Sequence, residues 1–251
     1  MENNNIKESC VKAIVTGASS GIGLEITRLL LENNYIVYGF GKSFNKGDSS
    51  SKIINDLEEK FGERFIKIEC DLRDTSDLVK AVKDINKNHD ISVLINNAGV
   101  GYYGLHEELN SEKIMEMVRV NLEVPMLLTN LLLRDLKNNE GHVINISSIT
   151  ATKDNPHGCA YGATKAGLLS FSKSLFEENR KYGLRVTCIS PDMTDTNLYR
   201  NADFTADGEL MAHLEPVEVA KACLYALNGR KGMVLTDITL RPQLHRISKK
   251  K

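Results

Sequence analysis

Short apolar runs alternate with helix-length segments along almost the whole chain, and this alternation limits the fold more than any other feature. The runs are rich in β-branched residues, whereas the segments between them repeat apolar residues at helical spacing. Strands separated by helices need crossover connections, which make the strands parallel and cover both faces of the sheet. Strands are expected at 11–17, 35–40, 64–70, 91–96, 141–148, 184–190 and 233–240.

The intervening segments complete the predicted architecture. Helices are expected at 22–34, 50–61, 76–88, 111–136, 161–181 and 217–227. The order of elements predicts a doubly wound α/β fold of three layers around a mostly parallel sheet. A chain of 251 residues that is 41% hydrophobic suits one large core, so we expect a single domain over 1–251.

Charge and composition argue against several classes of partner. The formal net charge is −1 without any long basic block, which disfavours nucleic acid or an anionic membrane as the main partner. No apolar run reaches membrane-spanning length, and the polar N-terminus is unlike a secretion signal, so a cytoplasmic protein is expected. Scattered cysteines and unpaired histidines predict neither disulfides nor a metal site. The basic segment 246–251 is expected to be disordered.

A glycine-rich turn, "TGASSGIG", joins the first expected strand to the first expected helix. Gly17, Gly21 and Gly23 remove the side chains that would keep a pyrophosphate from backbone amides and a helix N-terminus. The spacing is GxxxGxG rather than GxGxxG. Glycines also make simple tight turns, but the position in the first βα unit favours dinucleotide binding.

Tyr161 and Lys165 lie one helical turn apart in "YGATK", which places them on the same face of the expected helix. An unperturbed tyrosine has a pKa of about 10 and is a poor base near neutrality. A neighbouring ammonium favours the phenolate and lowers that pKa. An isolated pair of this kind would be interpreted as two surface residues, so its meaning depends on the other motifs.

Five motifs occur together in order along nearly the whole chain: TGASSGIG at 16–23, NNAG at 96–99, Asn121, the serine pair 147–148 and YGATK at 161–165. The set resembles the short, single-domain type of the short-chain dehydrogenase/reductase family. This resemblance implies a Rossmann-type sheet that binds NAD or NADP, in agreement with the predicted fold. It also implies a homodimer or homotetramer formed through the helices expected at 111–136 and 161–181. An epimerase or dehydratase of the longer family branch is disfavoured by the short chain and the GxxxGxG spacing.

The resemblance assigns a catalytic set. Tyr161 would protonate or deprotonate the substrate oxygen, and Lys165 would lower its pKa and hydrogen-bond the nicotinamide ribose. Ser148 would donate to the substrate carbonyl and stabilise developing negative charge, whereas Ser147 fits the spacing less well. Asn121 would hold a water that links the lysine to solvent.

The resemblance also assigns contacts with the cofactor. Asp71 would touch the adenine, or only cap a helix, and Asn97 would lie beside the adenine ribose, or only stabilise the sheet. The segment after Pro191 would touch the nicotinamide amide. No metal is expected, and the expected cofactor contacts are Gly17, Ser19, Ser20, Gly21, Ile22, Gly23, Lys42, Ser43, Asp71, Leu72, Asn97, Tyr161, Lys165, Thr194 and Thr196.

The end of the second expected strand bears on which dinucleotide is bound. A protein specific for NAD usually has an acidic residue there, which accepts from the ribose 2′-hydroxyl. This chain has Gly41 instead, followed by Lys42 and Ser43, which suit a 2′-phosphate. Lys42 also fits an ordinary exposed turn, so we expect NADP(H) to be preferred with NAD(H) as the alternative.

The sequence limits the substrate less strictly. Asp192 stands where the family usually has glycine, so it would need a backbone shape easier for glycine, with its carboxylate near the pocket. Segment 192–215 mixes apolar and polar residues, as expected of a loop that covers a substrate. Tyr102 and Tyr103 either face the substrate or lie at a rim without a function.

The predicted activity is that of an oxidoreductase that interconverts a ketone or aldehyde and an alcohol by hydride transfer with NADP(H). The substrate is a small molecule, and a hydroxy acid, a small carbonyl compound and a hydroxysteroid stay open. The alternative is a non-catalytic dinucleotide-sensing module. Loss of Tyr161 or Lys165 would have favoured it, and both residues are present.

Overall fold

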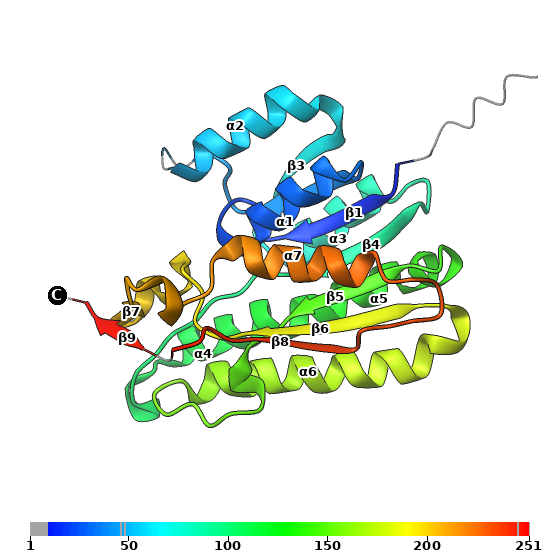
Figure 1. The fold of residues 1–251 in the computed structure, drawn as a ribbon. Helices are drawn as coiled ribbons and strands as arrows, with labels where there is room; N and C mark the ends of the chain where they lie inside the picture. Colours follow the sequence, from blue (N-terminus) through cyan, green and yellow to red (C-terminus); the bar gives the residue numbers. More distant parts are fainter. Residues whose placement is uncertain (1–9, 46, 48, 245, 251) are drawn as a thin grey trace, which may run out of the picture.

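A parallel sheet of seven strands runs through the protein, in the order β3-β2-β1-β4-β5-β6-β8 (Figure 1). The computed structural model describes residues 10–45, 47, 49–244 and 246–250. The strands are β1 (Lys12–Thr16), β2 (Ile36–Gly41), β3 (Phe65–Glu69), β4 (Ile91–Asn96), β5 (His142–Ile146), β6 (Arg185–Pro191) and β8 (Asp237–Leu240). All neighbouring pairs in this sheet are parallel, which confirms the predicted Rossmann-type fold.

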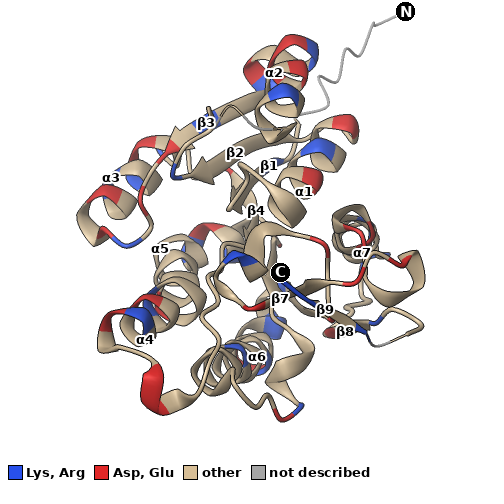
Figure 2. Ribbon diagram, turned by 90° about the vertical axis from the view of Figure 1, so that its left-hand side faces the viewer, with Lys and Arg blue, Asp and Glu red and all other residues tan. Residues whose placement is uncertain are grey.

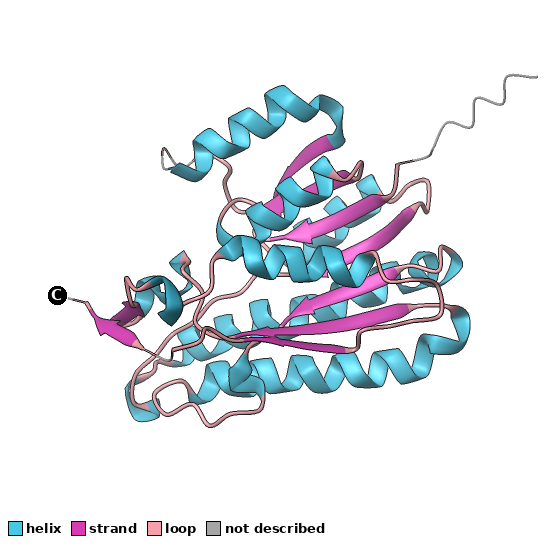
Figure 3. Cartoon of the chain, in the orientation of Figure 1, coloured by secondary structure: helices cyan, strands magenta, loops and turns pink. Residues whose placement is uncertain are grey.

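Helices cover both faces of the sheet (Figures 2 and 3). They are α1 (Gly21–Glu32), α2 (Ser49–Phe61), α3 (Thr75–Ile85), α4 (Ser111–Val118), α5 (Val124–Asn138), α6 (Cys159–Asn179) and α7 (Pro216–Leu227). Helices α1, α2 and α7 pack on one face, and α3, α5 and α6 pack on the other. The three predicted layers are therefore present in a single domain.

The core lies in two clusters separated by the sheet. In β1, Ala13 and Val15 belong to the cluster under α1 and α7, whereas Ile14 belongs to the cluster under α3, α5 and α6. This division follows from the alternation of side chains along a strand. Because both faces are covered, β1 is apolar on both sides, which explains its nearly continuous apolar run.

Helix starts follow local capping chemistry. The Asp74 carboxylate accepts from the backbone amides of Ser76 and Asp77 and begins α3. At α7, Glu215 and Glu218 form a reciprocal capping box with Pro216 in the first turn. Such caps satisfy amides that a helix leaves without partners, so they fix helix ends that apolar spacing alone places only approximately.

The long helix expected at 111–136 is interrupted. Between α4 and α5, Arg119–Glu123 forms a π-helical segment that contains Asn121. A π-helical turn is rare and often marks a functional position. The apolar spacing continues across the interruption, which is why the sequence predicted one helix.

The C-terminal segment was expected to be disordered, and this prediction is wrong for Ile247–Lys249. These residues form β9, which pairs antiparallel with β7 (Phe204–Ala206). Pairing satisfies backbone groups that would otherwise need water. Lys251 lies outside the described residues. Segment 192–215 contains β7 and two helical turns, Asn197–Asn201 and Leu210–Ala212, rather than a loop without structure.

The cysteines, the apolarity of the helices and the placement of metal-binding side chains complete the description of the fold. Each cysteine in the described part of the chain, namely Cys10, Cys70, Cys159, Cys188 and Cys223, is a free thiol. No described helix is both long and apolar enough to cross a membrane. Residues 10–45, 47, 49–244 and 246–250 hold no group of three or more His, Cys, Asp or Glu side chains that could bind a metal ion.

Candidate active site

A cleft of about 350 Å³ opens at the carboxyl ends of the strands. The strand order reverses there, because β1 pairs with β2 on one side and β4 on the other. Ligands of open α/β sheets bind at such a switch point. The predicted residues that line the cleft are Gly17, Ser19, Ser20, Gly21, Ile22, Lys42, Asp71, Leu72, Asn97, Ser148, Tyr161, Lys165, Thr194 and Thr196. Gly23, Ser43 and Asn121 are not among the lining residues.

The turn between β1 and α1 forms one end of the cleft. Gly17 has a φ of +70° and Gly21 a φ of +54°, which glycine adopts without strain. A Cβ atom on Gly23 would lie 2.2 Å from the Gly17 carbonyl oxygen, so Gly23 permits close packing rather than lining the cleft. The Ser20 side chain makes no hydrogen bond that caps the start of α1. The first amides of α1 therefore offer a site for an anion such as a pyrophosphate.

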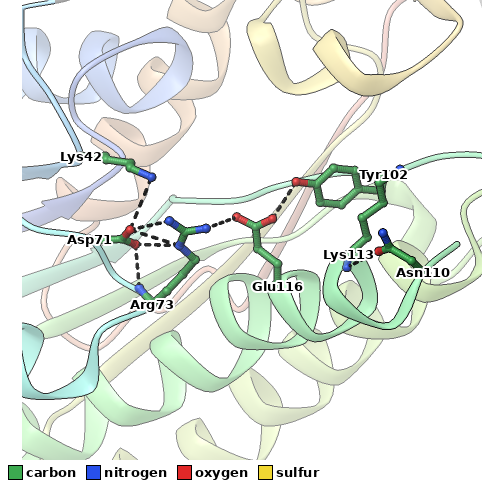
Figure 4. A network of polar contacts seen from close by, with 7 residues as sticks. All are labelled: Lys42, Asp71, Arg73, Tyr102, Asn110, Lys113 and Glu116. Carbon is green, nitrogen blue, oxygen red and sulfur yellow. Dashed lines mark hydrogen bonds and ion pairs between the residues drawn. The ribbon is translucent and has the colours of Figure 1, made fainter.

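A chain of polar contacts crosses the cleft beyond this turn (Figure 4). The Asp71 carboxylate lies 3.4 Å from Lys42 Nζ and 2.6 Å from Arg73 Nη2. Arg73 also pairs with Glu116 at 3.2 Å, and the Tyr102 hydroxyl donates to Glu116 at 2.6 Å. The hydrogen bond from Arg73 holds the pKa of Asp71 well below its usual range. The Lys42 side chain is 71% exposed, so it has freedom to reach an anion at the cleft edge.

Two neighbouring serines at the end of β5 face different ways. The Ser147 hydroxyl donates to the Lys165 carbonyl at 3.0 Å, which ties β5 to α6. Ser148 accepts from the Thr150 amide at 3.2 Å and also hydrogen-bonds the Tyr161 phenol. Both serines line the cleft, and Ser148 is the one whose side chain lies against the Tyr161 phenol.

Tyr161 and Lys165 are both buried on the inner face of α6. Burial raises the pKa of Tyr161 above its usual value, and the hydrogen bond with Ser148 acts in the opposite sense. Burial lowers the pKa of Lys165 to about 8. We expected Lys165 to lower the pKa of Tyr161, and this expectation is wrong for the protein alone, because loss of solvation outweighs any effect of the ammonium.

Asn121 lies behind the cleft wall and is fully buried. Its Oδ1 accepts from the Val100 amide at 2.8 Å, and its Nδ2 donates to the Val100 carbonyl at 2.9 Å and to Thr164 Oγ1 at 3.1 Å. A Cβ atom on Gly99 would lie 3.5 Å from Asn121 Oδ1 and 3.6 Å from Lys165 Nζ. Asn121 therefore sits close to Lys165 across Gly99, and it fastens the segment after β4 to α6.

Asn97 and the two predicted threonines line the cleft with their side chains already engaged. Asn97 Nδ2 donates to the Thr16 carbonyl at 2.9 Å, which joins the ends of β4 and β1. The Thr194 hydroxyl donates to the Asp192 carbonyl at 2.9 Å, and Thr196 Oγ1 accepts from the Leu198 amide at 3.3 Å. These bonds shape the cleft walls, and the sheet-stabilising interpretation of Asn97 is part of its role.

Asp192 differs from expectation. Its φ is not positive, so the idea that it needs a glycine-like backbone is wrong. Its side chain is only 4% exposed and lies 3.3 Å from Arg241 Nε, and its Oδ1 accepts from the Met193 amide at 2.8 Å. Asp192 lines the cleft, but its carboxylate binds the start of the C-terminal segment.

Sequence reasoning missed several residues that line the cleft, among them Arg73, Val100, Tyr199 and Arg200. Arg73 left a signal, because "DLRD" places a cation two residues after Asp71. Val100 directly follows NNAG. Tyr199 and Arg200 belong to the segment predicted to cover the substrate, but no local pattern distinguishes them from its other residues.

A glycine-rich turn, a serine, a tyrosine and a lysine thus meet at the switch point of a parallel α/β sheet, as in nicotinamide-dependent oxidoreductases. Residues 11–206 match the family described as short chain dehydrogenase, and the chain belongs to this family. It is an oxidoreductase of the short-chain dehydrogenase/reductase type.

Two curated relatives and one solved structure illustrate the likeness. An uncharacterized oxidoreductase from Staphylococcus saprophyticus is 32% identical over 92% of this chain and 96% of its own. A 3-oxoacyl-[acyl-carrier-protein] reductase from Chlamydia muridarum is 30% identical over 90% of this chain and 93% of its own. An alcohol dehydrogenase from Thermococcus sibiricus, complexed with 5-hydroxy-NADP, superposes with a TM-score of 0.83 at 25% identity, covering 95% of this chain and 99% of that one.

Proposed function

We propose that the protein interconverts a ketone or aldehyde and an alcohol with NADP(H), and that Ser148, Tyr161 and Lys165 carry the chemistry. The observation that supports this most is the meeting of the Ser148 hydroxyl and the buried Tyr161 phenol in the same cleft as the glycine-rich turn. A bound nicotinamide dinucleotide supplies or accepts the hydride.

In the reducing direction, the carbonyl carbon gains a hydride and its oxygen gains the proton of Tyr161. Because burial raises the pKa of Tyr161, the phenol carries that proton at neutral pH. The Ser148 hydroxyl donates to the same oxygen as negative charge develops on it. In the oxidising direction the phenol first loses its proton to solvent, and the phenolate form of Tyr161 then accepts the proton of the alcohol.

Lys165 and Asn121 support this proton transfer. Lys165 Nζ is held by the Ile146 carbonyl at 2.8 Å and retains donors for the phenolate and for a ribose hydroxyl. A pKa of about 8 keeps most of the lysine charged at neutral pH while allowing proton exchange. Asn121, close to Lys165 across Gly99, is assigned to hold a water between the lysine and solvent.

The cofactor preference rests on residues at the end of β2. A Cβ atom on Gly41 would lie 3.1 Å from both Phe44 and Ser19, so the position has little room for an acidic side chain. Lys42 is largely exposed and its contact with Asp71 is 3.4 Å long, so its ammonium can also pair with a 2′-phosphate. The 25% identical alcohol dehydrogenase binds 5-hydroxy-NADP, and a 26% identical metagenomic oxidoreductase is in complex with NADP. NAD(H) is the alternative. Ser43 donates to the Asn45 carbonyl and does not line the cleft, so it supports this preference less than Lys42.

The test is to follow NADPH absorbance with ketones, hydroxy acids and steroids, and then to repeat it with Tyr161→Phe. The variant deletes only the transferable proton, so we expect a loss of kcat of about 100-fold or more with NADPH affinity preserved in titration calorimetry. Tyr182→Phe, at an exposed tyrosine, is the matched control. Turnover at the wild-type rate in Tyr161→Phe would refute the assignment. Binding of NADPH without turnover of any substrate would instead favour the dinucleotide-sensing module.

We also propose that the segment covering the substrate is 192–215 and that the protein forms a homodimer or homotetramer. Six of the seven residues from Thr194 to Arg200 line the cleft.

The proposed homodimer or homotetramer is supported by exposed apolar residues on α4 and α5. Met115, Val118 and Met126 are exposed by 61%, 43% and 38%. Exposed apolar side chains on two successive helices favour association.

A further inference from the structure

Three aromatic side chains form a cluster that contacts Tyr161 through one of its members, Tyr103. We call Tyr103, Tyr199 and Phe204 the aromatic wall. The Tyr103 ring lies 5.7 Å from the Tyr161 ring and 5.2 Å from Phe204, centroid to centroid. Tyr199 lies 6.1 Å from Tyr103 and 5.5 Å from Phe204. These tilted and edge-to-face arrangements are those that aromatic rings prefer.

The aromatic wall is an apolar surface despite its two hydroxyl groups. Burial raises the pKa of Tyr103 well above its usual value and that of Tyr199 to about 12. Both phenols therefore stay neutral in the physiological range. Tyr199 lines the same cleft as Ser148 and Tyr161, whereas Tyr103 and Phe204 are not among the lining residues and pack against the Tyr199 ring.

The loop that carries Tyr103 is fixed on both sides. The neighbouring Tyr102 hydroxyl donates to Glu116 at 2.6 Å, which anchors the loop to α4. A Cβ atom on Gly101 would lie 2.8 Å from the Tyr103 ring, so this glycine lets the ring fold back over its own backbone. Asn201 Nδ2 donates to the Gly101 carbonyl at 3.4 Å and joins this loop to the segment that carries Tyr199 and Phe204.

The other half of the wall is held by the C-terminal segment. Strand β7, which contains Phe204, pairs with β9. The Leu244 amide donates to the Met211 carbonyl at 2.8 Å, and Arg246 pairs with Glu209 at 2.5 Å. A surface fixed in this way loses little freedom when a ligand binds to it, so its contacts favour binding more fully.

We propose that the aromatic wall recognises a flat aromatic ring attached to the carbonyl carbon, so that the substrates are aryl carbonyl compounds and the corresponding alcohols. A carbonyl oxygen that reaches Ser148 and Tyr161 places its substituent in the cleft that Tyr199 lines, and Tyr103 and Phe204 hold the Tyr199 ring in position. Ring-to-ring contacts favour an aryl substituent over an alkyl group of equal size by about tenfold. The proposal rests on the proposed carbonyl–alcohol chemistry and adds the class of substrate.

Charged recognition has less support at this end of the cleft. Arg241 is paired with the buried carboxylate of Asp192. Arg200 donates to the Asn197 carbonyl at 3.2 Å. Arg200 lines the cleft and keeps further N–H donors, so a substrate with its own carboxylate is the outcome against which the aryl proposal is tested.

The experiment compares three methyl ketones of equal carbon number, whose second substituent is phenyl, cyclohexyl or n-hexyl, with saturating NADPH. We expect kcat/KM to be about tenfold higher for the phenyl ketone than for either of the others. Tyr103→Leu and Phe204→Leu, on two separate segments, should each bring this ratio close to one. Tyr103→Phe should keep it. Tyr182→Leu, at a tyrosine that is 49% exposed, is the matched control and should leave the ratio unchanged.

Binding provides a measurement that does not depend on turnover. Titration calorimetry of the protein saturated with NADP⁺ compares 1-phenylethanol with 1-cyclohexylethanol, and the phenyl alcohol should bind about tenfold more tightly. Equal affinities would overturn the aryl proposal, as would a higher kcat/KM for 2-oxooctanoate than for the phenyl ketone. A preference for the phenyl alcohol in binding, without reduction of any ketone, would support the wall and refute the proposed activity instead.

Discussion

Lys165 Nζ lies 5.7 Å from the centroid of the Tyr161 ring and donates a hydrogen bond to the Ile146 carbonyl at 2.8 Å. Both side chains are buried, so neither charged form is well solvated. Burial accordingly raises the pKa of Tyr161 and lowers that of Lys165 to about 8. Tyr161 is therefore protonated at neutral pH, and Lys165 titrates close to neutral pH. Burial of this pair lowers the stability of the fold, which apolar side chains in the same place would not do.

Replacing this lysine should therefore stabilise the fold while it abolishes activity. The pKa of Lys165 falls from 10.5 to about 8 on folding, so the unfolded chain binds more protons between these values. The cost of the buried charge is full below pH 8 and fades as the pH rises toward 10.5. Lys165→Met should raise the free energy of unfolding at pH 7 by about 1–2 kcal/mol, after allowing for the lost bond to Ile146.

Urea denaturation at pH 7 and at pH 9.5 measures this effect. The gain in Lys165→Met should be smaller at pH 9.5 than at pH 7. Lys173→Met, an exposed lysine on the same helix, is the control and should show no such trend. A Lys165→Met protein that is less stable than wild type at pH 7 would contradict the account.

Cofactor preference provides a second prediction. Lys42→Ala should lower the ratio of kcat/KM for NADPH to that for NADH by about fivefold, because an exposed ion pair with a 2′-phosphate contributes about 1 kcal/mol. Steady-state kinetics with both cofactors measure the ratio, and Lys52→Ala on α2 is the control. The assignment fails if wild type prefers NADH or if Lys42→Ala leaves the ratio unchanged.

Self-association provides a third prediction. Met115→Glu combined with Met126→Lys places charges among the exposed apolar side chains of α4 and α5. If these helices form an interface, the buried charges weaken it, and the protein should shift toward monomer in sedimentation equilibrium. Tyr225→Glu, at a residue that is 67% exposed on α7, is the control. A wild-type protein that is monomeric at micromolar concentration would refute the predicted oligomer.

Features fixed by neighbouring residues could be predicted from the sequence. The turn between β1 and α1 depends on closely spaced glycines, and the pairing of Tyr161 with Lys165 depends on one helical turn. The parallel order of the sheet follows from the alternation of strands and helices, because few connections are physically available.

Features that join segments distant in the sequence could not be predicted from it. Arg73 meets Glu116 from 43 positions away, and Asn121 binds the Val100 backbone across 21 positions. The pairing of Ile247–Lys249 with β7 has no local signature in a short basic segment. The pKa of Tyr161 was misjudged for the same reason, because its burial depends on segments such as the Tyr103 loop that fold over it.

Removal of residues 246–251 should open the substrate end of the cleft while leaving the cofactor end intact. This truncation deletes β9 and the pairing of Arg246 with Glu209, and it also removes the Ser248 hydroxyl bond to Asp207 at 2.7 Å. Segment 192–215 then loses contacts that hold Phe204 in place, so KM for the carbonyl substrate should rise about tenfold. NADPH affinity should change little, because the glycine-rich turn and Lys42 lie on other elements.

Limited proteolysis distinguishes an opened segment from a general loss of stability. Trypsin should cleave the truncated protein after Arg200 faster than wild type, as followed by mass spectrometry, while sites in α1 and α5 stay protected. Lys249→Ala removes a charge from the tail but keeps the backbone pairing of β9, so it is the matched control. Equal KM and equal cleavage in truncated and wild-type protein would mean that the C-terminal segment does not hold the covering segment over the cleft.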